Sequence, residues 1–303
     1  MVGRKNKNMI IIFLLPALFF YLMEFVYPVI RTFFMSLFDV GAVETPIAEW
    51  TFAGFSNYAG LFQVTLFNRA VTNYLTLWFV GGLAVMFIAM VYAVILTSGV
   101  RLKRFWRAII YFPNIIAAIA LGTMWLQYVF RDFDGLGDRI VEFFGGDIPV
   151  MWTGPDMTIW SLLIAYCFGM VGYIMLIFIS GIEKIGDEYF EAATIDGANV
   201  FQKFFFITVP LIKGVIRSNI VIWTVALGTG VFAWSFMFSP NQMELASAMP
   251  PNYMREILFG GRGSAVIERD AGSAAAVGIM MALLVVVISL LSSLITRKDD
   301  VEL

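Results

Sequence analysis

The chain has 303 residues, of which 60% are hydrophobic and only 14% are charged, whereas globular domains are about 45–50% apolar and about 25% charged. A soluble protein of this length could not bury so much apolar surface, so the composition predicts an integral membrane protein. The formal net charge of −2 excludes the basic surface that nucleic-acid binding needs. A single cysteine, Cys167, excludes an intrachain disulfide, and the absence of histidine excludes imidazole metal sites and histidine acid–base chemistry.

Six stretches carry the roughly 20 apolar residues that a helix needs to cross a bilayer core of about 30 Å. They run over residues 9–30, 74–96, 109–130, 158–182, 215–238 and 271–295. The first is expected to be a retained span, because acidic residues and no small-residue cleavage site follow it. In the last, the spacing of Ala274, Gly278 and Ala282 predicts a helix-packing stripe. We therefore predict an all-α integral membrane protein that forms one domain over residues 1–303.

The orientation follows from lysine and arginine, which stay on the cytoplasmic side. With six spans, both termini lie on the same side as the second and fourth loops. That side carries twelve basic residues, namely Arg4, Lys5, Lys7, Arg101, Lys103, Arg104, Arg107, Lys184, Lys203, Lys213, Arg297 and Lys298. The other side carries six, namely Arg69, Arg131, Arg139, Arg255, Arg262 and Arg269, with Arg31 and Arg217 at span edges left out. Both termini and the 186–210 loop are therefore predicted to be cytoplasmic.

The 186–210 loop contains the start and stop signals of two short helices. Asp187 is expected to cap the first helix, Glu188 and Glu191 suit its positive end, and Gly197 is expected to stop it in a left-handed conformation. Asn199 and Gln202 then have the spacing of a capping box for a second helix. Phe201, Phe204 and Phe205 form an apolar stripe on that helix, before Pro210 begins the next span. An amphipathic connector lying on the membrane surface is the alternative interpretation.

This loop resembles a known signature. Glu191-Ala192-Ala193, Gly197 and Ile207-Thr208-Val209-Pro210 are similar to the EAA motif in permease subunits of binding-protein-dependent ATP-binding cassette (ABC) importers, with Val209 where that family usually has leucine. The resemblance to carbohydrate-type members extends over nearly the whole chain. Its other elements are Leu15-Pro16-Ala17, Tyr27-Pro28, Ser36-Leu37-Phe38-Asp39, the segment from Phe52 to Tyr58, Arg107 through Pro113, Trp125 and Ala271–Ala276. It weakens over residues 239–270, where Ser239-Pro240-Asn241-Gln242 replaces the usual glycine-rich turn.

The resemblance implies a permease in the inner membrane of a prokaryote, forming half of a heterodimeric pathway for a sugar or related polyol. Its implied partners are a second permease subunit, an ABC ATPase dimer and an extracytoplasmic solute-binding protein, in addition to the lipid bilayer. The implied ATPase-coupling residues are Glu188, Glu191, Ala192, Ala193, Asp196, Gly197 and Pro210. The sequence contains no Gly-Lys dipeptide and hence no P-loop. We therefore expect no catalytic residue, metal or cofactor in this chain, with ATP and Mg²⁺ bound by the partner ATPase subunits.

Two other classes of membrane protein are the alternatives. An ion-coupled secondary carrier usually places ionisable groups at membrane depth, and Glu24 is the clearest candidate, although a snorkelling acid or one paired with Arg31 is the simpler interpretation. A membrane-embedded enzyme would need a metal site or an acid–base pair, and neither can be assembled from this sequence.

A polyol is held by hydrogen bonds and by aromatic faces, and residues of these kinds occur near the middle of the fourth and fifth spans. The candidates along the solute path are Tyr166, Phe168, Gly169, Tyr173, Trp223, Thr224, Gly228 and Thr229. Ordinary helix packing is the alternative for each of them.

Overall fold

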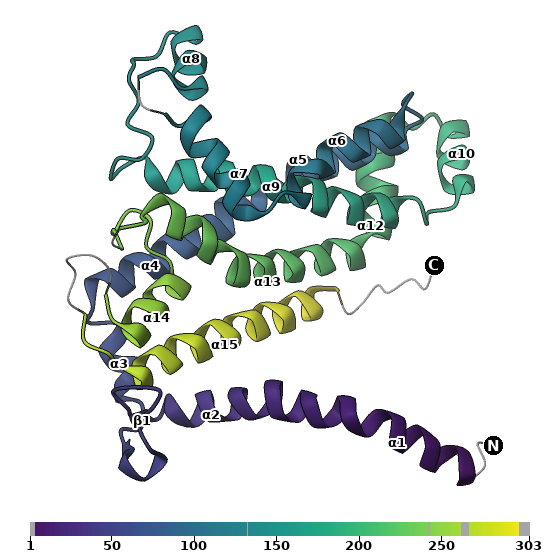
Figure 1. Cartoon of the computed structure of the whole chain (residues 1–303). Coiled ribbons are helices and arrows are strands. Elements are labelled where there is room, and N and C mark those ends of the chain that lie inside the picture. Colours follow the sequence, from purple (N-terminus) through teal and green to yellow (C-terminus); the bar gives the residue numbers. More distant parts are fainter. Residues whose placement is uncertain (1–3, 132, 242, 262–266, 297–303) are drawn as a thin grey trace. The chain divides into compact units, whose positions relative to one another are not determined.

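A computed structural model describes residues 4–131, 133–241, 243–261 and 267–296 (Figure 1). Four residues named above, Gln242, Arg262, Arg297 and Lys298, lie outside these ranges. The chain groups into two compact units, residues 1–64 with 254–281 and residues 65–253 with 282–303. Two helices, α14 (Pro250–Phe259) and α15 (Ala271–Thr296), run through both units, and the single domain stays a prediction.

The first unit begins with a long apolar helical segment. It comprises α1 (Arg4–Tyr21), the π-helical turn η1 (Leu22–Val26) and α2 (Tyr27–Met35), and residues Ile12–Met35 are apolar and long enough to cross a membrane. Short elements follow, namely β1 (Phe38–Asp39), η2 (Ile47–Glu49), β2 (Thr51–Phe52) and α3 (Ser56–Leu61). The two strands pair antiparallel, with Phe38 opposite Phe52.

The end of this first span is fastened to the segment that follows β2. The amide of Asn57 donates hydrogen bonds to the carbonyl oxygens of Ser36 and Phe38, at 3.0 and 2.9 Å. The Tyr58 hydroxyl donates to Ser36 Oγ at 2.8 Å, and the Leu37 carbonyl accepts from two backbone amides, those of residues 53 and 54. Two of the segments that carry the family resemblance therefore contact each other directly.

The beginning of α15 packs on the same structure. The amides of Ala271 and Gly272 both donate to the Val40 carbonyl, and Met35, Val40, Ala271 and Ala275 form a buried cluster. Farther along α15, Ala274 is buried and a β-carbon on Gly278 would lie 3.6 Å from the Met254 sulfur. The predicted packing stripe is therefore seen at these two positions, whereas Ala282 is exposed.

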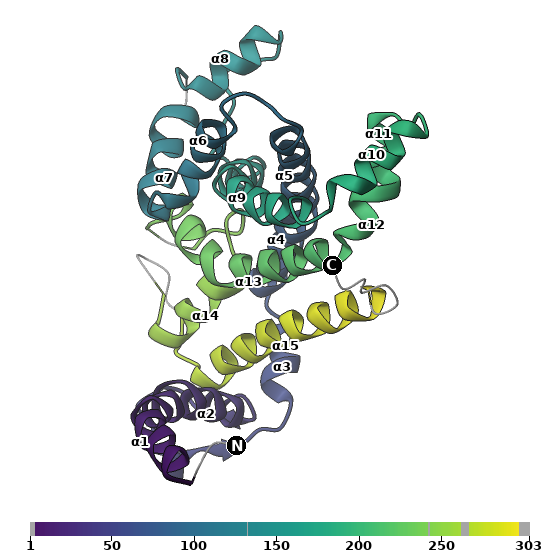
Figure 2. The same cartoon turned by 90° about the vertical axis from the view of Figure 1, so that its right-hand side faces the viewer.

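The second unit is built almost entirely from helices. In chain order they are α4 (Thr65–Thr76), η3 (Leu77–Gly81), α5 (Gly82–Thr97), α6 (Lys103–Ile115), α7 (Ala118–Met124), η4 (Trp125–Val129), α8 (Leu136–Phe143), α9 (Thr158–Ile182), α10 (Asp187–Ile195), α11 (Val200–Lys203), η5 (Phe204–Thr208), α12 (Val209–Leu211) and α13 (Lys213–Phe238). Figure 2 shows α9 between α5, α6 and α13. Because neighbours surround it, α9 is apolar on all sides and most of its residues are buried.

The described residues contain five helical segments that are apolar and long enough to span a membrane, and six if one bent pair counts as a single span. The prediction of an all-α membrane protein is confirmed. Two spans differ in detail. The second is longer than expected and runs from Thr65 to Thr97 without a break.

The third span, predicted as continuous over 109–130, is broken. Helices α6 and α7–η4 meet at an angle of 98°, and both linking residues, Ile116 and Ala117, are extended, with ψ of 135° and 134°. Pro113 near the end of α6 supplies no backbone donor, which weakens the last turn of that helix and favours a break there.

Candidate functional site

The first helix of the 186–210 loop, α10, begins at Asp187. Gly186 is its N-cap residue and no side chain caps the helix. The expectation that Asp187 caps the helix is therefore wrong. Asp187 and Glu188 instead occupy the first turn, where their charges still complement the positive end of the helix dipole.

The C-terminal end of α10 is closed by a Schellman motif. Gly197 has a φ of +78°, which confirms the expected left-handed conformation. The amide of Gly197 donates to the carbonyl of Thr194 at 3.1 Å, and that of Ala198 donates to the carbonyl of Ala193 at 2.8 Å. These two bonds satisfy carbonyls that the helix leaves free.

The second helix, α11, is fixed to the first. The predicted capping box is confirmed: Asn199 Oδ1 accepts from the Gln202 amide at 2.9 Å, and Gln202 Oε1 accepts from the Asn199 amide at 2.8 Å. Across the turn, Lys203 Nζ donates to Thr194 Oγ1 at 2.7 Å. The two short helices therefore form one firmly closed hairpin.

The hairpin exposes a surface made of both charged and apolar side chains. Of the predicted coupling residues, Glu188, Glu191, Ala192, Asp196 and Gly197 are exposed, Ala193 is buried and Pro210 is half-buried. The predicted stripe is divided, because Phe201 and Phe205 are exposed while Phe204 is half-buried. A cavity of about 310 Å³ lies between the two helices, with Ala193, Gly197 and Phe206 in its lining.

Two further residues extend this surface and were missed in the sequence. Ile195 is 87% exposed and Phe206 is 78% exposed. Large apolar side chains are costly to leave in water, so the exposure of these two on a loop outside the candidate spans is typical of a surface that meets either another protein or the membrane. The sequence offered one signal for them, since Ile195 and Phe206 are large apolar residues shortly before Gly197 and Pro210.

A second cluster lies between the helices around Trp223, which is buried on α13. The Trp223 ring packs edge-on against Tyr166 at 5.6 Å between centroids. Its indole N–H donates to the Trp78 carbonyl at 2.9 Å, and the Trp78 indole in turn donates to Thr224 Oγ1 at 3.0 Å. Gly82 leaves room for this ring, since a β-carbon there would lie 2.8 Å from Trp223 Nε1. Sequence reasoning missed Trp78 and Gly82, which are about 140 residues away in the chain.

The eight solute-path candidates are not gathered into one site. Tyr166, Trp223 and Thr224 are buried against other helices, and Gly169 contributes its carbonyl to a hydrogen bond from Asn114. Phe168 is exposed and packs on Trp125. The remaining three differ in exposure: Tyr173 and Gly228 are half-buried, and Thr229 is exposed. The burial of the first three supports the packing interpretation for them, and a role in solute contact stays a prediction for all eight.

Replacing Trp223 by alanine should destabilise the protein, because it removes a ring that is 1% exposed together with the hydrogen bond from its indole N–H to the Trp78 carbonyl. Burial losses of this kind cost about 3–5 kcal/mol. Replacing half-buried Tyr173 by alanine should leave the melting temperature nearly unchanged and reduce solute uptake instead. Both variants would be compared by thermal melting in detergent and by uptake. Normal melting with lost uptake for Trp223→Ala would identify Trp223 as a solute contact.

Glu24 and Arg31 do not pair. Glu24 is exposed, and among the described residues Arg31 forms its hydrogen bond with the Val43 carbonyl at 2.9 Å, while its guanidinium carbon lies 6.0 Å from the centroid of the Trp50 ring. The interpretation of Glu24 as an acid paired with Arg31 is therefore wrong in this structure. Its exposure on an apolar helix is in accord with a snorkelling acid.

Comparison with known proteins decides the family. Residues 85–298 match the family described as "Binding-protein-dependent transport system inner membrane component". The chain belongs to this family. It is a multi-pass membrane protein and the translocation subunit of an ABC importer, and the ion-coupled carrier considered above is excluded.

Individual relatives support this assignment. The chain is 32% identical over 214 residues to "Probable ABC transporter permease protein YurN" of Bacillus subtilis, covering 69% of this chain and 72% of that protein. It is 26% identical to "Probable starch degradation products transport system permease protein AmyD" of Thermoanaerobacterium thermosulfurigenes, over 99% of this chain and 97% of that protein. The fold is similar to a chain of a bacterial ABC transporter involved in the import of alginate, with a TM-score of 0.79 at 20% identity over 98% of this chain and 97% of that one.

Proposed function

We propose that the chain forms half of a membrane pathway for a sugar or related polyol. The observation that carries this proposal is the similarity over nearly its full length to a permease named for starch degradation products.

The energy for import comes from separate ATPase subunits, which bind ATP and Mg²⁺. The absence of a Gly-Lys dipeptide from this sequence supports that division of labour. The hairpin of α10 and α11 is the docking surface for the ATPase, since it combines exposed acids with the exposed side chains of Ile195 and Phe206. Glu191 faces solvent there and is free to meet a basic group of the partner.

A second permease subunit and an extracytoplasmic solute-binding protein complete the transporter. The span Ile12–Met35 supports the need for further apolar partners, because no residue is buried within the apolar 18-residue window that defines it. Lipid and a second permease subunit are the two surfaces that can cover such a helix.

Reconstitution tests this function. The chain would be purified with its co-expressed permease and ATPase partners, placed in proteoliposomes and supplied with binding protein and a panel of oligosaccharides, amino acids and inorganic ions. We expect ATP-dependent uptake of at least one oligosaccharide. Uptake of an amino acid or an ion alone would overturn the carbohydrate assignment, and uptake without ATP would overturn the role of the ATPase.

The proposed orientation places both termini and the α10–α11 hairpin in the cytoplasm of a prokaryotic cell. The charge asymmetry of the loops supports it. Single cysteines at Asp147 and Lys184, which are both exposed, would be probed with a membrane-impermeant maleimide in a Cys167→Ala background. We expect Asp147→Cys to react in intact cells and Lys184→Cys to react only after permeabilisation.

A further inference from the structure

Helix α6 is attached to α9 along one face. Arg107 Nη2 donates to Glu183 Oε1 at 2.5 Å, and the side-chain amide of Asn114 donates to the Gly169 carbonyl at 3.1 Å. Between these contacts the α6 backbone lies directly on Gly172, where a β-carbon would be 2.2 Å from the Ile110 carbonyl oxygen. Positions 107, 110 and 114 are spaced by three and four residues and so share one side of a helix.

The two helices run antiparallel along this contact, because increasing residue numbers in α6 meet decreasing numbers in α9. The ion pair lies at one end of the contact, and Glu183 is the residue that directly follows α9. Four residues later, at Asp187, the chain enters α10, the proposed ATPase-docking helix. At the other end, α6 stops at Ile115 and the chain turns by 98° into α7. Helix α6 is therefore held along its length by α9, and its direction is broken from that of α7.

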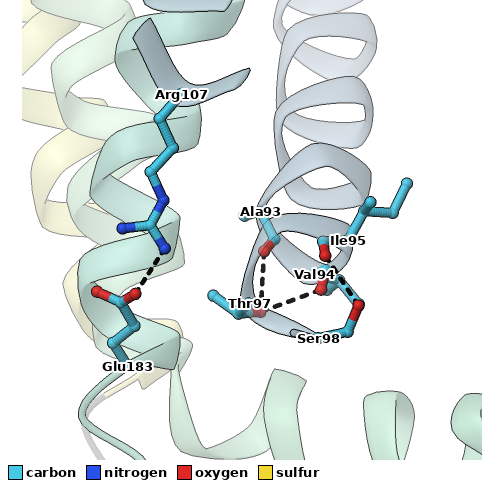
Figure 3. A network of polar contacts seen from close by, with 7 residues as sticks. All are labelled: Ala93, Val94, Ile95, Thr97, Ser98, Arg107 and Glu183. Carbon is cyan, nitrogen blue, oxygen red and sulfur yellow. Dashed lines mark hydrogen bonds and ion pairs between the residues drawn. The ribbon is translucent and has the colours of Figure 1, made fainter. Parts of the chain in front are cut away.

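Figure 3 shows the ion pair and the hydroxyls at the end of α5. Arg107 extends from α6 toward Glu183 at the end of α9. The nearby hydroxyls of Thr97 and Ser98 donate to carbonyls of their own helix, α5, and so do not link it to α9. Among the described residues, Glu183 is the hydrogen-bond partner of the Arg107 guanidinium, whose buried Nε has none.

We propose that Arg107 and Glu183 are a positioning pair for transport: they lock the beginning of α6 to the end of α9, so that movement of α10 carries α6 and is delivered to the break at residues 116–117. The proposal rests on the proposed docking of the ATPase at α10. An ion pair whose side chains are 21% and 44% exposed contributes little to the free energy of unfolding. Its loss should therefore affect the transmission of movement more than the fold, because the close contact between α6 and α9 at Gly172 remains.

Charge reversal tests the pair. Arg107→Glu and Glu183→Arg, each alone and combined, would be purified with the partner subunits and assayed for stoichiometry, melting temperature, ATPase rate and solute imported per ATP hydrolysed. We expect each single variant to assemble with an unchanged ATPase rate and to import about fivefold less solute per ATP, the low end of typical coupling between sites. The double variant, which restores the attraction with exchanged charges, should recover most of that ratio.

Matched variants exclude simpler explanations. Arg131→Glu removes another ion pair, the one with Asp134, whose side chains are 65% and 58% exposed, and it should leave the import ratio unchanged. Glu183→Gln keeps the shape of the side chain and removes its charge. It should show the same loss of solute imported per ATP, and it provides the test if the charge-reversal variants fail to assemble. A normal import ratio in both Glu183→Gln and Arg107→Glu would overturn the proposal, as would a double variant no better than the single ones. Wild-type uptake that does not require ATP would instead refute the proposed function.

Discussion

Replacing Gly172 by valine is expected to prevent the folded subunit from accumulating in the membrane. A β-carbon at this position would lie 2.2 Å from the Ile110 carbonyl oxygen and 2.6 Å from Tyr111 Cα. These are backbone atoms, which cannot rotate away as a side chain could, so α6 itself would have to shift. Overpacking of a tight core costs about 1–3 kcal/mol even where side chains can adjust, and here the loss should exceed that range.

The measurement is the yield of monodisperse protein and its melting temperature in detergent. Gly214→Ala is the matched control, because a β-carbon on Gly214 meets nothing within 4 Å and alanine is favoured over glycine in a helix by about 1 kcal/mol. The control should melt at the same or a slightly higher temperature. Gly172→Ala should fall between the control and Gly172→Val. If Gly172→Val melted like the control, the close contact of α6 with α9 would not exist in the membrane.

Local rules explain which features were predictable from the sequence. The end of α10 at Gly197 and the capping box of Asn199 and Gln202 depend on residues within three or four positions of one another, and both were predicted correctly. The beginning of α10 was misplaced by one residue, because Asp187 and Gly186 can both serve as N-cap and only the observed backbone distinguishes them. The apolar spans were also predictable, since length and hydropathy define them without reference to partners.

Long-range contacts explain what could not be predicted. The Trp223 indole was interpreted as a possible solute contact because nothing in the sequence reveals its partner, the Trp78 carbonyl, which is 145 residues away. The break in the third span was missed because Ile116 and Ala117 are apolar residues that suit a membrane helix equally well. Pro113 was a signal for it, but a proline alone does not distinguish a kink from a 98° turn.

For the predicted solute path, residue type alone does not distinguish a binding site from helix packing. Tyr166 and Thr224 have the chemistry of a polyol site, and that chemistry also suits helix packing. Burial separates the two interpretations, since Tyr166 is 3% exposed and Thr224 is fully buried. The fold of the 186–210 loop was easier to predict, because its left-handed glycine and its capping residues act on neighbouring residues, and the hairpin is closed by its own hydrogen bonds.

Replacing Gly197 by valine is expected to leave the protein inserted in the membrane and to reduce ATP-driven uptake at least about tenfold, the effect of roughly 1.4 kcal/mol on a coupling equilibrium. The φ of +78° at this position costs a residue with a β-carbon about 1 kcal/mol or more, and a β-branched one more still. No atom lies within 4 Å of the position that the new β-carbon would take, so the backbone conformation is the only source of strain. The strain would open the Schellman motif and redirect α10.

The assay compares subunit stoichiometry, ATPase rate and uptake of the purified complex. Gly197→Asn is the matched control, because asparagine tolerates the left-handed region that valine avoids, and it should retain most of the uptake. Glu191→Lys, which reverses an exposed charge on α10 without touching its backbone, should weaken uptake less than Gly197→Val does. A defect of equal size in Gly197→Asn and Gly197→Val would show that side-chain bulk at a protein contact matters there, and not the left-handed turn. Normal uptake in Gly197→Val and Glu191→Lys together would reduce the hairpin to a connector and remove the mechanical argument for docking at α10.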